Sequence, residues 1–195
     1  MMKRVILASN SPRRRELLGI FGFDFDIIAD NTPECVEDNL TPEETVRFLA
    51  EFKGNNVIST LDSSENAVVI SADTVVAVNN TVLGKPKDAK EAEEMLLLLS
   101  DNVHTVYTGV CVKDICTKKS VVFCEKTEVF FKKLDIMEIK DYINTGEPMD
   151  KAGAYGIQNR GALFVKKICG DYFNVVGLPV CRLGEVLKKD FELYF

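Results

Sequence analysis

The stretch Ala67-Val68-Val69-Ile70-Ser71-Ala72-Asp73-Thr74 decides the fold, because it is an apolar, β-branched run that ends beside a carboxylate. Such a short run is typical of a strand buried on both faces in the middle of an α/β sheet. We expect Asp73 at the carboxyl end of this strand, where open α/β sheets bind ligands. Residues 74–83 are predicted to continue as a β-hairpin that turns at Asn79-Asn80. Since no helix follows for Asp73 to cap, a functional carboxylate and a structural one remain equally good interpretations of this segment alone.

The composition is that of an ordinary globular chain. Its 195 residues, 46% hydrophobic and 28% charged, predict a single domain over residues 1–195 with a sizeable core. Near the N-terminus, Val5-Ile6-Leu7-Ala8 is too short an apolar run for a signal peptide. No run approaches the roughly 18 residues needed to span a bilayer. We therefore expect a cytoplasmic protein without a membrane partner.

Charge and reactive residue types narrow the function further. The net charge of −6 argues against nucleic acid as a partner, because binding phosphates at scale needs a basic face. The six cysteines form no C-x-x-C pair and are interpreted as reduced thiols. The single histidine, His104, weakens Ser-His and Cys-His schemes and multi-histidine zinc sites, and we interpret it as structural. An enzyme built from this chain is expected to use carboxylates for acid–base chemistry.

An anion site is predicted where the first helix begins. The first strand leads through Ser9-Asn10-Ser11, whose last serine is a good N-cap, into a helix over 12–20. Arg13, Arg14 and Arg15 then stand where the helix dipole is already positive, at a cost of about 0.3–1 kcal/mol each if exposed. An anion bound by the free N–H groups of the turn relieves that repulsion. The alternative is that the arginines fan out into water. We expect Arg13 and Arg14 to face the anion and Arg15 to point outward.

Two lysines stand at restrained positions. Thr41 opens a helix with a capping box, and Lys53 trails the apolar stripe of that helix, where most lysines only snorkel. Lys85 lies between Gly84, which permits a close backbone approach, and Pro86, which stiffens it, so its ammonium is expected near a fixed point.

The C-terminal part contains a glycine-rich segment, residues 147–161, with three glycines within nine residues. This spacing marks backbone that turns sharply or lets another group approach closely. After it we predict a hairpin over 163–176 that turns at Gly170-Asp171, and a last helix after Pro179. The predicted elements together give an α/β fold with a mixed twisted β-sheet flanked by helices.

These motifs resemble the Maf family of nucleotide pyrophosphatases. The opening Ala8-Ser9-Asn10-Ser11-Pro12-Arg13-Arg14, the pair Ser71–Thr74 with Leu83–Pro86, and the segment 147–168 are similar to the family's signatures. The last is similar to the dTTP/UTP pyrophosphatase subgroup, and the resemblance covers nearly the whole chain. One departure is Asn159, where the subgroup commonly has Gly. Because Asn tolerates positive φ, we expect the loop to survive this change.

The resemblance implies a reaction and a site. The fold would be Maf/ITPase-like, with a substrate cleft. The reaction would be hydrolysis of a nucleoside triphosphate, preferably dTTP or UTP and also modified uridine nucleotides, to the monophosphate and pyrophosphate, as a house-cleaning activity. A divalent cation, Mg²⁺ or Mn²⁺, would be the cofactor. Water would attack the α-phosphorus.

The resemblance also assigns roles to residues of this chain. Asp73 would orient or deprotonate the water, and with Glu34 it would hold the metal through oxygen ligands. Base selectivity would rest on Arg13, Thr74 and Gln158. The amide of Gln158 matches O4 and N3–H of uracil or thymine, provided that a neighbour pins it, and the sequence does not show which one. The substrate phosphates would be bound by Ser9, Arg13, Arg14, Lys53 and Lys85.

Two alternatives stay open. The chain could regulate cell division by binding a partner, since the family was named for an effect on septum formation, although partner binding does not require a carboxylate among four cations. The enzyme could instead act on inosine or xanthosine triphosphates, against which Gln158 and the loop 151–161 argue. The oligomeric state is not fixed by the sequence, with a homodimer as one option.

Overall fold

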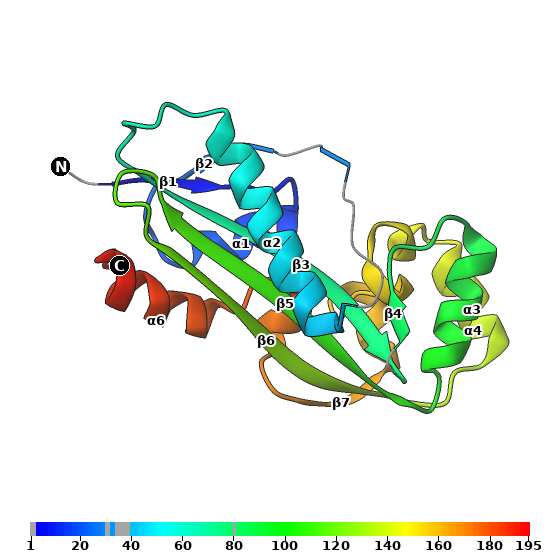
Figure 1. The fold of residues 1–195 in the computed structure, drawn as a ribbon. Helices are drawn as coiled ribbons and strands as arrows, with labels where there is room; N and C mark the ends of the chain where they lie inside the picture. The colour runs from blue at the N-terminus through cyan, green and yellow to red at the C-terminus, as the bar shows by residue number, and fades with distance from the viewer. Residues whose placement is uncertain (1–2, 30–31, 34–39, 80) are drawn as a thin grey trace. The chain divides into compact units, whose positions relative to one another are not determined.

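The chain folds as two compact units in the computed structural model, which describes residues 3–29, 32–33, 40–79 and 81–195 (Figure 1). Unit 1 comprises Met1–Asp73, Thr108–Glu125 and Gly177–Phe195, and unit 2 comprises Thr74–Tyr107 and Lys126–Val176. Three long strands contribute residues to both units: β3 (Ala67–Val78), β5 (Val103–Asp114) and β6 (Ser120–Phe131). The single domain over 1–195 stays a prediction.

Within the described residues the strands form a seven-stranded sheet in the order β2-β1-β3-β5-β6-β7, with β4 paired to β3. Strand β1 (Arg4–Leu7) is parallel to β2 (Asp26–Ile27) and to β3. Strand β4 (Thr81–Leu83) is antiparallel to β3, and β7 (Val165–Cys169) is antiparallel to β6. The predicted mixed α/β sheet is confirmed.

In unit 1 the helix α2 (Pro42–Ser59) packs closely on the sheet (Figure 1, cyan). It begins with the predicted capping box between Thr41 and Glu44. A Cβ at Gly54 would lie 2.7 Å from Oγ of Ser71, so only glycine allows this helix to approach β3 without a shift. The Ser71 hydroxyl also donates to the carbonyl of Ala50 at 2.6 Å. The other helices of this unit are α1 (Pro12–Gly19) and α6 (Val180–Phe191).

In unit 2 the helices α3 (Ala89–Leu99) and α4 (Ile136–Ile143) contact each other and bury their apolar faces in one core (Figure 1, green and yellow). Asp88 and Asp135 cap them, each accepting a backbone N–H of the first turn. Three short 3₁₀ segments follow: η1 (Glu147–Asp150), η2 (Ala152–Ala154) and η3 (Asn159–Phe164). Aromatic residues of the core, among them Phe131 and Phe164, lie edge-on against each other, a geometry worth about 0.5–1.5 kcal/mol beyond burial.

The expectation that Asp73 ends its strand is wrong. Strand β3 continues from Ala67 to Val78, so Asp73 lies inside it. The β-branched residues persist beyond Asp73, and the chain turns only at Asn79, which has a φ of 49°. The neighbouring parallel strand β1 does end here, since its last residue, Leu7, pairs with Ile70. Asp73 therefore lies three residues past the carboxyl end of β1 rather than of its own strand.

The predicted hairpin over 163–176 is also wrong in its second half. Strand β7 forms and pairs with β6, but the chain then enters the short helix α5 (Tyr172–Val176). The buried amide of Asn174 donates to the carbonyl of Val106 at 3.1 Å and to Oγ1 of Thr127 at 3.0 Å. These buried tertiary bonds outweigh the local preference of the segment for a returning strand.

Two further observations concern the chain as a whole. No helix in the described ranges is both long and apolar enough to cross a membrane. The five cysteines that the structure describes are free thiols. Burial raises the pKa of the Cys111 thiol to about 11 and that of Cys124 to about 12, so both stay protonated at neutral pH.

Candidate active site

The turn before α1 is a hydrogen-bonded structure in unit 1. Oγ of Ser11 caps the helix by accepting from the backbone N of Arg14 at 3.4 Å. Oγ of Ser9 accepts from the N of Ser11 at 3.2 Å and from Nη1 of Arg14 at 3.4 Å. Nε of Arg14 donates to the carbonyl O of Gly177 at 2.9 Å. Ser9 and Arg14 are therefore brought together, and the guanidinium is held against the turn.

The three arginines of this first turn differ in exposure. Arg13 and Arg14 are half-buried, whereas Arg15 is exposed. The first turn of α1 carries no acidic residue to offset their charge. The positive end of the helix dipole and the guanidinium groups thus lie together without a compensating carboxylate in that turn, which favours anion binding. The roles of Ser9, Arg13 and Arg14 stay predictions.

Lys53 and Asp73 form an ion pair that the sequence did not predict. Nζ of Lys53 lies 2.5 Å from Oδ1 of Asp73, and the two side chains are only 18% and 11% exposed. The close contact of Gly54 with Ser71 explains the meeting, because it sets the adjacent Lys53 over the part of β3 that carries Asp73. A charge-assisted hydrogen bond shielded from water fixes both groups. The partners are distant in sequence, so no local pattern indicates them.

Only one of the two predicted metal ligands can be placed. Glu34 lies outside the described residues, whereas Asp73 is described and half of its carboxylate is engaged by Lys53. In the described part of the chain no three His, Cys, Asp or Glu side chains group as a metal site. Mg²⁺ commonly takes one or two carboxylates together with substrate phosphates and waters. Asp73 therefore fits a cation that is bound together with the substrate.

Unit 2 brings together the segments that carry the other predicted residues. The backbone N of Gly153 donates to the carbonyl O of Gly84, the neighbour of Lys85, at 3.0 Å. Gly153 has a φ of 68°, and a Cβ there would lie 3.0 Å from the side chain of Val76, two residues past Thr74. The glycine-rich loop, the Lys85 segment and strand β3 thus pack at one point of this unit.

Gln158 lies in the glycine-rich loop directly before η3. Its side chain is half-buried and does not cap that helix. The next residue, Asn159, has a φ of 54°, so the expectation that Asn meets the need for positive φ is confirmed. A neighbour that pins the Gln158 amide is not found among the residues that the structure describes. The backbone around Gln158, by contrast, is firmly held.

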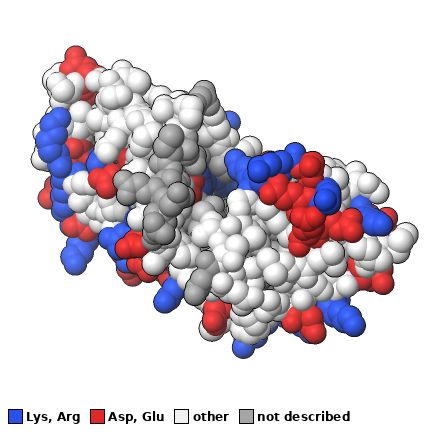
Figure 2. All heavy atoms as spheres, turned by 45° about the vertical axis from the view of Figure 1, so that its right-hand side comes forward, with Lys and Arg blue, Asp and Glu red and all other residues white. Residues whose placement is uncertain are grey.

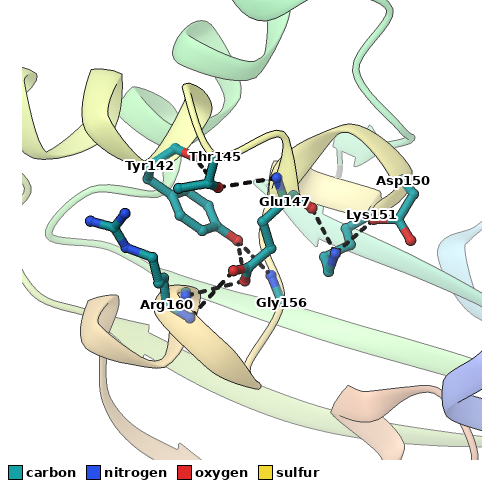
Figure 3. A network of polar contacts seen from close by, with 8 residues as sticks. Tyr142, Thr145, Glu147, Asp150, Lys151, Gly156 and Arg160 are labelled. Atoms are coloured by element: carbon teal, nitrogen blue, oxygen red, sulfur yellow. Dashed lines mark hydrogen bonds and ion pairs between the residues drawn. The ribbon is translucent and has the colours of Figure 1, made fainter.

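Glu147 holds this backbone, and sequence reasoning missed it (Figure 3). Its Oε1 accepts from the hydroxyl of Tyr142 at 3.0 Å and from the N of Gly161 at 3.3 Å. Its Oε2 accepts from the N of Arg160 at 3.4 Å. The Tyr142 oxygen in turn accepts from the N of Gly156 at 3.2 Å. The one available signal was a carboxylate at the start of a segment rich in glycine, where free backbone N–H groups are common.

His104 is a buried structural residue of unit 2. It is 1% exposed, its Nε2 lies 2.7 Å from the hydroxyl oxygen of Tyr155, and its ring lies edge-on against Phe131. Burial lowers the pKa of His104 from 6.5 to about 4, so the imidazole is neutral at pH 7.

Charged side chains of both signs share the surface. On the face drawn in Figure 2, Lys and Arg form small groups that alternate with Asp and Glu. The pattern agrees with a net charge of −6 made of 24 basic and 30 acidic residues.

The fold and these residues define a mixed α/β protein with a cationic turn and a strand-borne carboxylate. The family profile described as Maf-like protein matches residues 4–190. The chain is 50% identical over 192 residues to a dTTP/UTP pyrophosphatase of Alkaliphilus metalliredigens, which covers 98% of each chain. It is 53% identical over 187 residues to a dTTP/UTP pyrophosphatase of Bacillus pumilus, which covers 96% of each. The chain belongs to the Maf family.

Solved structures give a weaker likeness. A nucleoside-triphosphatase, named dITP/XTP pyrophosphatase, of Mycobacterium abscessus aligns with a TM-score of 0.44 and 14% identity, over 67% of this chain and 75% of that one. A likeness of this size does not bear on the reaction.

Proposed function

We propose that this protein is a nucleoside triphosphate pyrophosphatase that hydrolyses dTTP and UTP to the monophosphate and pyrophosphate. The observation that carries the proposal is the shielded pair of Lys53 and Asp73, 2.5 Å apart, just past the carboxyl end of β1. The Ser9 to Arg14 turn begins at that same strand end. Relatives about half identical over nearly the whole length are dTTP/UTP pyrophosphatases, which supports the choice of substrate.

Hydrolysis at the α-phosphorus requires that the water be positioned and that negative charge be compensated. A water oxygen attacks the α-phosphorus, the bond from that phosphorus to the bridging oxygen breaks, and pyrophosphate leaves with that oxygen. Asp73 orients the water and takes its proton. The triphosphate is negative throughout, so cations placed along it lower the barrier. The residues that serve this purpose are Ser9, Arg13, Arg14, Lys53 and Lys85.

A divalent cation, Mg²⁺ or Mn²⁺, completes the proposal. Asp73, together with Glu34, would hold it, and the bound ion would offset charge on the phosphate oxygens. Lys53 keeps the Asp73 carboxylate in one orientation, and the positive charge of its ammonium would offset charge on the nearby phosphate.

We propose that Gln158, Thr74 and Arg13 set base selectivity. When its orientation is fixed in the complex with substrate, the amide of Gln158 offers an acceptor and a donor that match the N3–H and O4 of uracil and thymine, whereas cytosine presents the reverse pattern. A mismatched base leaves polar groups of the site unpaired, at about 1–3 kcal/mol per group. Modified uridine nucleotides that keep this edge are accepted too, which suits a house-cleaning enzyme of the cytoplasm.

The test is an assay of the products from a panel of triphosphates with Mg²⁺. We expect monophosphate and pyrophosphate, with dTTP and UTP fastest, CTP slower and purine triphosphates poor. Preference for GTP or ITP, or release of single phosphates in place of pyrophosphate, would overturn the proposal. Light scattering on the same sample tests a homodimer, which stays a prediction.

A further inference from the structure

Glu147 is held in place at its backbone as well as at its carboxylate. Its N donates to Oγ1 of Thr145 at 3.1 Å, and its carbonyl O accepts from Nζ of Lys151 at 2.6 Å. The preceding Gly146, with a φ of 75°, is the N-cap of η1, and its N donates to the carbonyl O of Ile143, the last residue of α4, at 2.9 Å. Figure 3 shows the carboxylate pointing toward Tyr142 and the backbone of Gly156 and Arg160. Its position is therefore fixed independently of the loop that it contacts.

Tyr142 extends the reach of this carboxylate. Its ring is 2% exposed and lies edge-on against Phe164, with ring centres 4.9 Å apart. Burial raises the pKa of Tyr142, and the adjacent Glu147 carboxylate raises it as well. The phenol therefore stays protonated and donates a hydrogen bond to Glu147. The phenol oxygen is then free to accept from the N of Gly156.

These bonds close the loop 156–161 at both ends. Glu147 binds the N–H groups of Arg160 and Gly161 directly, and it reaches that of Gly156 through Tyr142. The two ends also touch, because a Cβ at Gly161 would lie 2.2 Å from the carbonyl O of Gly156. Gln158 lies between them.

We propose that Glu147 is a positioning residue for base selectivity, which it sets by closing the 156–161 loop and so placing Gln158. The inference rests on the proposed function, in which Gln158 reads the base. A carboxylate suits this task because both of its oxygens only accept, and they face two backbone N–H groups and a phenol. An amide of the same shape has an acceptor at one position and a donor at the other. The donor then meets another donor.

The test compares Glu147→Gln with Glu138→Gln. Glu138 is a matched control in the same unit, because its Oε1 lies 2.5 Å from Nζ of Lys132, a residue outside the loop 156–161. We expect the ratio of kcat/KM for dTTP over CTP to fall about tenfold in Glu147→Gln and to stay unchanged in Glu138→Gln. A melting temperature recorded for each variant separates loss of fold from loss of selectivity.

A second comparison asks whether the effect passes through Gln158. In a Gln158→Ala background, Glu147→Gln should leave the dTTP over CTP ratio unchanged, because the side chain that it places is gone. If Glu147→Gln does not fold, Tyr142→Phe keeps the ring, removes the link to Gly156, and should lower the same ratio in the same direction.

The measurements distinguish failure of the Glu147 inference from failure of the proposed function. A lower melting temperature with an unchanged ratio, or an equal drop with and without Gln158, would make Glu147 merely structural and overturn the inference while the proposed function stands. A parent enzyme without preference for dTTP over CTP would overturn the proposed selectivity, and this inference with it.

Discussion

Lys53 and Asp73 lie on different elements, α2 and β3, yet Nζ of the lysine is 2.5 Å from Oδ1 of the carboxylate. The pair depends on the close approach of the two elements at Gly54. A charge-assisted hydrogen bond of this kind holds the ammonium and the carboxylate in fixed positions. Lys53 therefore orients the carboxylate that we propose as the general base.

Asp73→Asn should lower kcat by about 100-fold or more, because the amide keeps the shape but cannot take a proton from water. The fold and much of the nucleotide affinity should remain. Glu51→Gln is the control: Glu51 is on the same helix as Lys53, and its Oε1 forms an ion pair with Nζ of Lys113 at 2.8 Å. Pyrophosphate release measures the rate. Near-normal turnover in Asp73→Asn would exclude it as the base.

Arg13→Ala should reduce the rise in melting temperature caused by a non-hydrolysable dTTP analogue, because the arginine no longer meets the triphosphate. Arg15 lies two residues further along the helix and is exposed, so Arg15→Ala removes the same charge and should keep the full rise in melting temperature. The measurement is thermal unfolding with and without the analogue. Equal rises in both variants would show that the arginines are only a solvated face.

Gln158→Ala should flatten the order of substrates more than it lowers the rate with the best one, because the lost amide discriminates between bases rather than driving the chemistry. The readout is kcat/KM for dTTP, UTP, CTP and GTP under one set of conditions. A variant that keeps the order of the parent would remove Gln158 from the selectivity site.

His104 should make stability fall with acidity. Its pKa is about 4 in the folded chain and 6.5 ordinarily, so the unfolded chain binds the additional proton. The stabilisation is complete above pH 6.5 and is lost as the pH falls toward 4, by up to about 3 kcal/mol. Protonation would also leave a buried N–H at Nδ1, which has no partner among the described residues.

Urea unfolding between pH 7 and pH 4.5 measures this dependence. His104→Gln is the comparison, and since the chain has a single histidine, no other imidazole contributes. The variant should lose the part of the slope that lies between pH 6.5 and 4.5. Parallel curves for the parent and the variant would show that His104 is not the titrating group.

The sequence predicted what depends on neighbouring residues. The caps at Ser11 and Thr41, the hairpin turn at Asn79 and the positive φ of Asn159 are each determined by local chemistry, and the structure contains all of them. The turn from Ser9 to Arg14 is also determined locally, since three of its hydrogen bonds join residues five or fewer positions apart. The exception is the bond from Arg14 to Gly177.

What the sequence missed depends on contacts between distant segments. The helix α5 forms where a strand was predicted, because Asn174 finds buried partners on β5 and β6. The Lys53 to Asp73 pair requires the packing of α2 on β3. No short sequence motif indicates the role of Glu147, since its hydrogen-bond partners lie up to fourteen residues away. Asp73 was placed at the wrong strand end, because the sequence did not reveal that β1 stops where β3 continues.

The bond from Arg14 to the carbonyl of Gly177 has a consequence for synthesis on the ribosome. The segments of unit 1 are spread over the chain, and its last one begins at Gly177, whereas every residue of unit 2 precedes that point. A nascent chain that has not yet extruded Gly177 lacks the acceptor for Arg14. Helix α1 is translated before unit 2, yet it is among the last parts to reach its final set of bonds, and unit 2 has its complete sequence outside the ribosome before unit 1 does.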